Sequence, residues 1–506
     1  MKHGWGMVGP VTQRDWRDDR IDELEKQLKD ALAQNAKLER LLKAALERIA
    51  ELEEKLGQSS RNSSRPPSSD SLKQQAERKK KAAAITKRSS SKRKPGAQPG
   101  HKMFSRQLVP MAEVSRHHDC IPESCELCAA KLRGRDPNPR LHQVASLPLP
   151  VQPEVDQYAL HALECQDCGH VTRGRLPLGV PSGAFGPSVI AVVTLLMGVC
   201  RLGKRTVQQL LHDLFGLQMS LGAVIGCQQL GSDALEAPVE EARQFVRHAT
   251  VKHSDETSWR QGAERAKVWL WTVVTASVTV FAIQRERSTA AAKTLLGKLG
   301  GILVSDRYSA YGFWRLRMRQ VCWAHLIRDF VAIAERGGTS ARIGDALLEE
   351  ARRLFGWWHR VRDGDLTRER FQKYVGPLRK RVHALLSQGQ ACKHQKTART
   401  CANILQVFDA LWLFVQRAGV EPTNNIAERA VRHAVMWRKL CGGTHSERGS
   451  RFVERVLTVV ATLRQQNRNT LAFLRAACEA RFKGTQPPSL LHESVASCSS
   501  KLARAA

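Results

Sequence analysis

Long apolar runs are scarce in this sequence of 506 residues. Two candidates, Ser188 to Cys200 and Trp269 to Ile283, fall short of the roughly 20 residues that a membrane-crossing helix needs. Met1 to Arg20 mix charges with Gly and Trp and lack the apolar core of a secretory signal. We therefore expect no membrane partner, and a cytoplasmic, nucleoid-associated location.

Acidic residues are too few to balance the basic ones. The chain has 48 Asp and Glu against 80 Lys and Arg, which gives a formal net charge of +32. A polyanionic partner, and DNA above all, is the simplest interpretation of this excess. Because single cores rarely exceed about 250 to 300 residues, the length predicts three or more structural units.

Tyrosine is rare as well, with four residues in the whole chain. Tyr308 and Tyr311 lack the Arg and His-x-x-Arg companions that a tyrosine recombinase requires. A covalent tyrosine mechanism is therefore a poor fit.

Cysteines number thirteen, an odd count that argues against a disulfide framework and for reduced or metal-bound thiols. Four of them form two Cys-x-x-Cys pairs in a predicted zinc-binding domain at 111–180. Two such knuckles supply the four thiolates of a tetrahedral Zn²⁺ site. Cys120 and His117 or His118 are spare candidates. The predicted ligands are Cys125, Cys128, Cys165 and Cys168.

Residues 18–57 are predicted to form a leucine-zipper-like coiled coil, since apolar residues recur in a heptad pattern over five repeats. Asn35 falls on an a position, where a buried amide favours a two-stranded state. We expect a homodimer or higher multimer; the alternative is a lone amphipathic helix packed on the body. The a and d positions are Ile21, Leu28, Leu42, Ile49 and Leu56, and Leu24, Ala31, Leu38, Ala45 and Leu52.

Residues 58–110 combine Ser, Pro and Gly with clusters of basic side chains. Such a composition buries no core, so we expect a disordered basic linker. It either holds DNA phosphates without reading sequence or is merely a solvated linker. The predicted DNA contacts in it are Lys92, Arg93 and Lys94.

Residues 181–247 are predicted to be helical, with a turn at Gly216 to Met219 and Ser220 as the N-cap of a third helix. This pattern fits a helix-turn-helix DNA-binding region. Because the third helix is poor in Arg and Lys, a plain helical spacer is the alternative.

The pattern changes to strands after Ala249, and the predicted fold class of this part is α/β. Three strands (249–253, 268–274 and 278–283), a helix (290–299) and two strands (302–305 and 319–323) predict a mixed sheet. This core is expected at 248–330 and 420–445, interrupted by a helical insertion at 331–419. C-terminal helices at 446–485 and a tail at 486–506 complete the chain.

Three acids stand at the edges of these elements: Asp255 and Asp306 after strands, and Glu428 at the start of a helical run. Carboxylates that converge repel one another by roughly 4 kcal/mol at 4 Å and an effective dielectric near 20, unless a divalent cation lies between them. Each acid also has a structural alternative. Asp255 and Asp306 fit turn residues, and Asn425-x-x-Glu428 fits a capping box.

Several ordered motifs resemble the transposases of the insertion-sequence-sixty-six family of bacterial mobile elements, over nearly the whole length. They are NSSRPPSSD (62–70), KRKPGAQPGHK (92–102), the two Cys-x-x-Cys pairs, HSDET (253–257), SDRYSAY (305–311), CWAHLIRDF (322–330) and NNIAERAVR (424–432).

The resemblance implies an RNase H-like catalytic core in which Asp255, Asp306 and Glu428 form the DDE triad. It also implies roles in multimerisation and terminal-repeat binding for the zipper, the zinc segment and the helix-turn-helix. Cys120 and the Pro-Glu-Ser spacer crowd the first knuckle and depart from the expected pattern.

Two Mg²⁺ (or Mn²⁺) ions held about 4 Å apart by such carboxylates support in-line phosphoryl transfer. The expected function is thus a DNA transposase that binds terminal inverted repeats, frees 3′-OH ends and joins them to target DNA, with or without accessory proteins of the element. The alternatives are a nuclease without strand transfer and a transposase-derived DNA-binding protein without catalytic activity. Basic residues near the acids are expected to contact phosphates, with a solvated face or a structural ion pair as the alternative: His325, Arg328, Arg432, Arg438 and Lys439.

Overall fold

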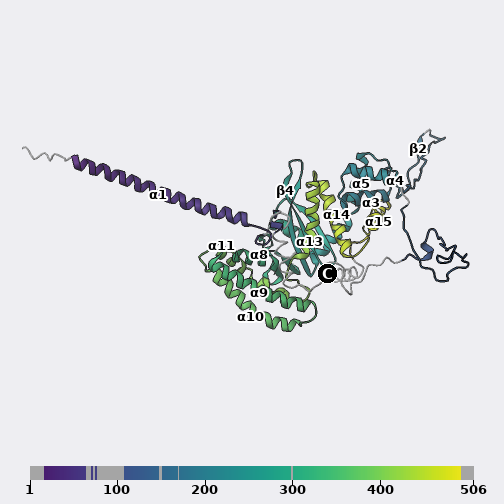
Figure 1. Ribbon diagram of the computed structural model, residues 1–506. Coiled ribbons are helices and arrows are strands. Elements are labelled where there is room, and N and C mark those ends of the chain that lie inside the picture. Colours follow the sequence, from purple (N-terminus) through teal and green to yellow (C-terminus); the bar gives the residue numbers. More distant parts are fainter. Residues whose placement is uncertain are drawn as a thin grey trace, which may run out of the picture. The chain divides into compact units, whose positions relative to one another are not determined.

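The computed structural model describes residues 16–63, 70–71, 74–76, 108–147, 151–168, 170–297 and 300–491. The chain divides into two compact units (Figure 1). One draws on 1–85, 325–357 and 378–402, and the other on 86–324, 358–377 and 403–506. None of the helices in the described ranges combines the length and apolar character that crossing a bilayer requires.

The first unit begins with one continuous helix, α1 (Trp16–Gly57), visible in Figure 1 as a long rod. Its Leu, Ala, Glu and Lys content favours helix, and no Gly or Pro interrupts it before Gly57. Its apolar a and d side chains face water: Leu28 is 60% exposed and Leu42 is 62% exposed. This apolar stripe is therefore available to a partner.

A short segment after α1 is held by its own polar side chains. The amide and hydroxyl of Ser60 donate to the two carboxylate oxygens of Asp70, over 2.7 and 2.6 Å, and both residues are buried. Asn62 Nδ2 donates to Glu335 Oε2 over 2.6 Å. These residues lie in the range expected to be disordered. They are ordered instead, because hydrogen bonds rather than apolar burial hold them in place.

Four helices make up most of the remaining described residues of the first unit, and each of the four also has residues in the second unit. These helices pack closely at two glycines. A Cβ at Gly344 would lie 2.3 Å from the Ala334 amide nitrogen, and a Cβ at Gly389 would lie 2.4 Å from Cys401 Sγ. The four helices cover most of the region 331–419 that the sequence pattern predicts to be a helical insertion. The helices are α8 (Trp323–Ala334), α9 (Gly338–Arg362), α10 (Arg368–Gln390) and α11 (Gln395–Leu405).

The second unit contains a five-stranded mixed sheet of order β5-β4-β3-β6-β7. The first three strands are antiparallel, whereas β6 and β7 run parallel to β3. The predicted mixed α/β sheet is thus confirmed. Its strands are β3 (Val251–Gln261), β4 (Ala266–Val274), β5 (Thr279–Gln284), β6 (Ile302–Ser305) and β7 (Arg319–Val321).

Strand β3 is longer than predicted. Its polar residues after His253 suggested a strand end, yet β4 pairs with it up to Gln261 opposite Ala266. Trp259 is fully buried there. Pairing and burial outweigh the weak strand preference of these polar residues.

Helix α14 (Glu447–Gln465) packs along the edge strand β5, and every fourth residue of the helix meets every second residue of the strand. Side-chain oxygens of Glu454, Thr458 and Thr462 accept from the amides of residues 283, 281 and 279, respectively. Four helical residues rise about 6 Å and two strand residues about 6.6 Å, so the two spacings agree. The edge amides are therefore satisfied by side chains, which protects an otherwise open edge.

Other helices surround this core. The predicted helical region contains α3 (Pro187–Gly198), α4 (Lys204–Phe215), α5 (Leu221–Ala234) and α6 (Glu236–His248). As predicted, the Ser220 hydroxyl caps α5 by accepting from the Ala223 amide. The remaining elements are α7 (Thr289–Leu296), α12 (Leu413–Gln416), α13 (Asn425–Cys441), α15 (Thr470–Lys483) and the 3₁₀ turns η2 (Met111–Glu113), η3 (Ser309–Tyr311), η4 (Leu316–Met318) and η5 (Phe408–Leu411).

Candidate functional site

Two of the predicted acids are aligned by parallel strand pairing. The parallel β3–β6 register pairs His253 with Val304. Asp255 and Asp306 each come two residues later, so they lie level with each other. Asp255 lies inside β3, not at a strand end, and Asp306 follows β6 directly. The turn alternative for Asp255 is therefore wrong.

The third acid, Glu428, lies in the first turn of α13, and Asn424 fastens the start of that helix to β3. Asn424 Nδ2 donates to the Ser254 carbonyl over 2.8 Å, and its Oδ1 lies 3.2 Å from His253 Nδ1. Asn424 is the N-cap residue and its side chain binds β3 rather than the helix, so Asn425 is not the N-cap that the capping-box alternative for Glu428 requires.

The end of α13 is fastened to the same strand. The Thr444 amide donates to the Arg260 carbonyl and the Gly262 amide to the Thr444 carbonyl, each over 2.9 Å. Gly443 has a φ of +117°, and a Cβ there would lie 2.2 Å from the Arg260 carbonyl oxygen, so only glycine fits. The helix that carries Glu428 is thus tied to β3 at both ends.

The three acids interact electrostatically. Burial raises the pKa of Asp255 well above its usual value, and the charges of Glu256, Asp306 and Glu428 raise it further. The Glu256 amide donates to Asp255 Oδ1 over 3.0 Å, which partly offsets these effects. A carboxylate in this position is stabilised by an added cation.

A fourth acid, Glu256, lies beside the trio with partners of its own. Arg287 donates to Glu256 Oε1 from Nε and Nη2 over 2.8 and 2.6 Å, and the Tyr311 hydroxyl donates to Oε2 over 2.6 Å. Burial, and next the Asp306 charge, raise the pKa of Glu256, while Tyr311 and Arg287 oppose this rise. Glu256 is therefore a neutralised structural acid that holds β3 in place.

The turn after β6 fixes Asp306. Its Oδ1 accepts from the Tyr308 amide over 2.9 Å, which is the turn contact considered as the alternative for this residue. Arg319 Nη2 donates to the Asp306 carbonyl over 2.7 Å. Asp306 thus shapes its own turn and also acts on Asp255 through space.

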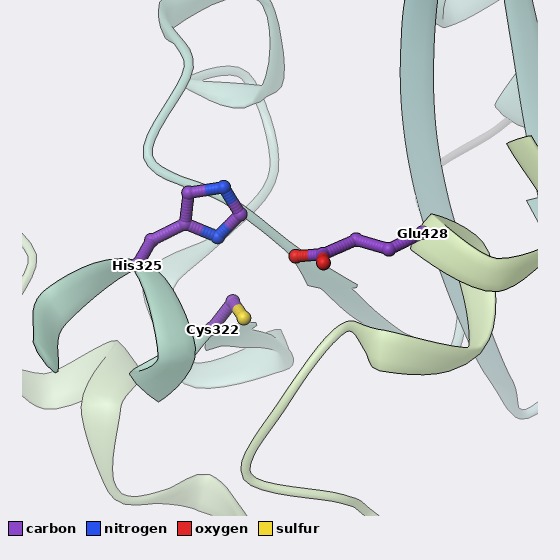
Figure 2. Close-up of side chains that lie close together, drawn as sticks. All are labelled: Cys322, His325 and Glu428. Atoms are coloured by element: carbon purple, nitrogen blue, oxygen red, sulfur yellow. The ribbon is translucent and has the colours of Figure 1, made fainter. Parts of the chain in front are cut away.

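Figure 2 shows Cys322, which follows β7, and Glu428 reaching toward it from α13, with His325 one turn further along in α8. Cys322 Sγ and a Glu428 carboxylate oxygen lie within 4.8 Å of each other. Cys322 is fully buried, and its sulfur accepts from the Asn424 amide over 3.1 Å. Cys322 therefore helps to seat the start of α13.

The predicted DNA-contacting residues have different surroundings. Arg432 and Lys439 are exposed on α13. Arg438 instead donates to the backbone and hydroxyl of Ser258 and to Thr257 Oγ1, so its guanidinium binds β3. His325 and Arg328 lie in α8. Lys92, Arg93 and Lys94 lie outside the described residues.

The predicted zinc ligands form two separate knuckles. The Ala129 amide donates to the Cys125 carbonyl, and the Cys165 amide donates to the His170 carbonyl, each over 2.9 Å. The second knuckle lies between the paired strands β1 (Ala162–Glu164) and β2 (Val171–Arg173). In the part of the chain that the structure describes, the four sulfur atoms do not converge within ligand distance.

Both knuckles favour thiolates. The backbone amide of Cys128 and then that of Leu127 lower the pKa of Cys125, and those of Asp167 and then Cys168 lower the pKa of Cys165. A lowered thiol pKa favours metal binding. The surrounding segment is almost wholly exposed, including Leu127 at 99%, so it has little apolar core of its own.

Helix α5 packs against α3, α14 and α15. Its exposed residues, Gly222, Ile225 and Gly226, include no cation. This composition fits the spacer alternative better than a recognition helix.

Sequence reasoning missed Asn424, Cys322 and Glu256. Asn424 bonds to residues 170 and 171 positions away, and Cys322 contacts a residue 102 positions away, so no local pattern marks them. Glu256 did carry a signal, because an acid on a buried strand requires a cationic or hydrogen-bonding partner.

Residues 182–452, more than half of the chain, match a family model described as Transposase IS66 family. Residues 11–107 match a second model, described as a family of unknown function. No curated protein matches the chain. The first match contains the three acids, whereas the four knuckle cysteines lie outside both matches.

Proposed function

Because the chain belongs to the IS66 family of transposases, we propose that it cuts DNA at element ends and joins the freed 3′-OH to target DNA, using Asp255, Asp306 and Glu428. The partly buried Asp255, whose charge interacts with those of Asp306 and Glu428, carries the proposal. The β3–β6 register and the attachment of α13 to β3 support a shared site, although in the described part of the chain the three carboxylates do not all lie within 4.8 Å of one another. The strand order supports an RNase H-like core.

The donor set fits hard divalent cations such as Mg²⁺ or Mn²⁺, which prefer carboxylate oxygens. Asp255, Asp306 and Glu428 would hold them. The raised pKa of Asp255 reflects repulsion among these groups and burial, both of which a bound cation offsets. When bound, two such ions activate a hydroxyl nucleophile and stabilise the leaving 3′ oxygen of a phosphodiester.

The protein's own residues keep the carboxylates in place. Asn424 and Thr444 hold α13 on β3, while Arg287 and Tyr311 neutralise Glu256 next to Asp255. Neutralising the fourth acid matters because a further free charge would strengthen the repulsion. Arg432 and Lys439 are exposed on α13 and would position DNA phosphates, together with His325, Arg328 and the basic linker at 92–94.

The two knuckles support a structural Zn²⁺ site made by Cys125, Cys128, Cys165 and Cys168. Each knuckle directs backbone amides at its first cysteine, and the segment around them lacks a core. Small segments of this kind gain their folding free energy from the metal. Zn²⁺ binding would require the sulfur atoms of the two knuckles to come together.

The exposed stripe of α1 supports a coiled-coil dimer. A single helix in water gains nothing from the seven large apolar side chains that the described part of this stripe exposes by 44 to 62%. A second copy of the same helix would cover them. We propose that dimerisation brings two element ends together.

A plasmid carrying the element ends tests the proposed activity. Purified protein with Mg²⁺ should nick it and join pre-cleaved ends to a target, and Asp255→Asn and Asp306→Asn should each bind the DNA but not cut it. Binding of the ends by the wild type without nicking or joining would refute the catalytic proposal.

A further inference from the structure

A pocket of about 220 Å³ lies in the second unit, beside the face of α13 that carries Ile426, Arg429, Ala430 and His433. Val274 of β4 forms part of the pocket wall, and this residue pairs with His253 of β3. His253 precedes Asp255 by two residues. The pocket thus shares β4 and α13 with the surroundings of the acids, but its lining residues on α13 lie on a different face of the helix from Glu428.

The pocket gathers positive charge without a counter-ion. Arg201, Arg429 and Arg464 line it together with His433, and its lining contains no Asp or Glu. Burial lowers the pKa of His433, and the charges of Arg464, Arg201 and Arg432 lower it further. Like charges gathered in one pocket repel one another, although solvent screens the exposed Arg429 and Arg464. Such a cluster is stabilised by a bound anion.

Arg201 adds a second, independent observation. Its φ is +59°, a left-handed conformation that is strained for a residue other than glycine. Its Nε atom is buried and has no hydrogen-bond partner in the described part of the chain. Glycine would be less strained at this position, so the backbone conformation gives no reason of its own for an arginine here.

The pocket walls favour a compact anion with several acceptor oxygens. Val274, Phe281 and Val456 supply apolar surface, which strengthens the field of the cations. Guanidinium groups match phosphate in geometry and number of donors. We propose that this pocket binds one backbone phosphate of a DNA strand that runs past the helix carrying Glu428. The identity of the ligand as DNA rests on the proposed function.

Two pairs of variants of the full chain test this proposal. Arg464→Gln removes a pocket cation, and Arg448→Gln removes an exposed arginine of the same helix outside the pocket. Ala461→Glu places a carboxylate among the arginines, and Ala461→Gln is its uncharged counterpart of equal size. The readout is the anisotropy of a labelled DNA duplex carrying the element end, measured over a salt series.

Arg464→Gln should weaken binding several-fold and reduce the slope of log affinity against log salt by about 1, whereas Arg448→Gln should leave the slope unchanged. Ala461→Glu should weaken binding more than Ala461→Gln. Equal effects within both pairs would overturn the proposal while leaving DNA binding and cutting by the wild type intact.

A titration with inorganic phosphate, followed by ³¹P resonance, separates free anion from DNA. Phosphate binding that Ala461→Glu abolishes, together with unchanged DNA affinity in the same variant, would refute DNA as the ligand. If the wild type neither binds nor cuts DNA, the proposed function fails first.

Discussion

Asn424 donates a hydrogen bond of 2.8 Å to the carbonyl of Ser254, although 170 residues separate the two along the chain. Ser254 precedes Asp255, and Asn424 precedes the helix that carries Glu428 by one residue. One buried side chain thereby sets the spacing between two of the three acids.

Replacing Asn424 with Ala should slow DNA cutting about 10- to 100-fold, since a small displacement of reacting groups has effects of this size. It should also lower the free energy of unfolding by about 1 to 3 kcal/mol, because the polar groups it contacts lose their partner. The matched control is Asn425→Ala, which alters an exposed neighbour. Equal activity of the two variants would contradict the positioning role.

Replacing Gly443 with Ala should destabilise the second unit by about 2 kcal/mol or more, since the added Cβ meets the Arg260 carbonyl and the φ is unfavourable. Gly226→Ala, in the middle of α5 with open space around it, should instead stabilise by about 0.5 to 1 kcal/mol. Thermal denaturation of both variants measures the difference. A melting temperature for Gly443→Ala at or above that of the wild type would show that the attachment after α13 is not tight.

Replacing Cys128 with Ser should reduce the zinc content of the purified protein and increase proteolysis of the segment from 111 to 180, because a ligand is lost. Cys120→Ser is the control, since this exposed cysteine lies outside both knuckles. Metal analysis by mass spectrometry gives the readout. Zinc retained by Cys128→Ser would remove Cys128 from the ligand set.

Replacing Leu28 and Leu42 together with Glu should produce monomers, because charges on the apolar stripe prevent the helices from pairing. The double variant Ala33→Glu and Ala44→Glu makes the same change of charge on exposed positions outside the stripe. Light scattering distinguishes the two masses. A double Leu variant with the mass of the wild type would mean that α1 does not hold the copies together.

Lys252 gives the second unit a pH dependence. The residue is fully buried, donates to the Arg247 carbonyl over 2.7 Å, and burial lowers its pKa to about 8 from 10.5. Between these two values the unfolded chain binds more protons than the folded one, so stability rises with pH. The stabilisation that comes from deprotonating Lys252 is complete above 10.5, its pKa in the unfolded chain, and is lost as pH falls through about 8, its pKa in the folded chain.

Lys252→Met should abolish this contribution. The stability of the wild type relative to the variant should increase by on the order of 1 to 3 kcal/mol as pH rises from about 8 to 10.5. Lys293→Met, at an exposed lysine, is the control. A constant difference in melting temperature between Lys252→Met and the wild type would show that Lys252 titrates normally.

The elements of the sheet were predictable because β-branched runs such as Val268 to Val274 carry a local signal. The full length of β3 was not, since His253 to Gln261 depends on pairing with β4 and on burial of Trp259. Local spacing alone likewise predicted the two cysteine knuckles. Whether the knuckles meet depends on contacts between distant parts of the chain.

The three acids were predictable as candidates because each follows or opens a recognisable element. Their surroundings were not. Asn424 bonds to a residue far away in the sequence, and Arg201 is marked by its backbone conformation. Neither feature is visible in a sequence pattern. The Ser60–Asp70 contact was missed for a related reason, since a polar segment without apolar residues resembles a linker.

The chain leaves the sheet after Cys322 and returns at Asn424, where one hydrogen bond of 3.1 Å joins the two points. Everything between them forms an excursion whose ends meet, and the entropy of closing such a loop grows only slowly with its length. A change of length among the helices of this segment should therefore leave the start of α13 in place as long as Leu411 and Phe414 keep their hydrogen bonds to Gln320 of β7. The loops between these helices are thus the positions at which an added module would least affect the acids.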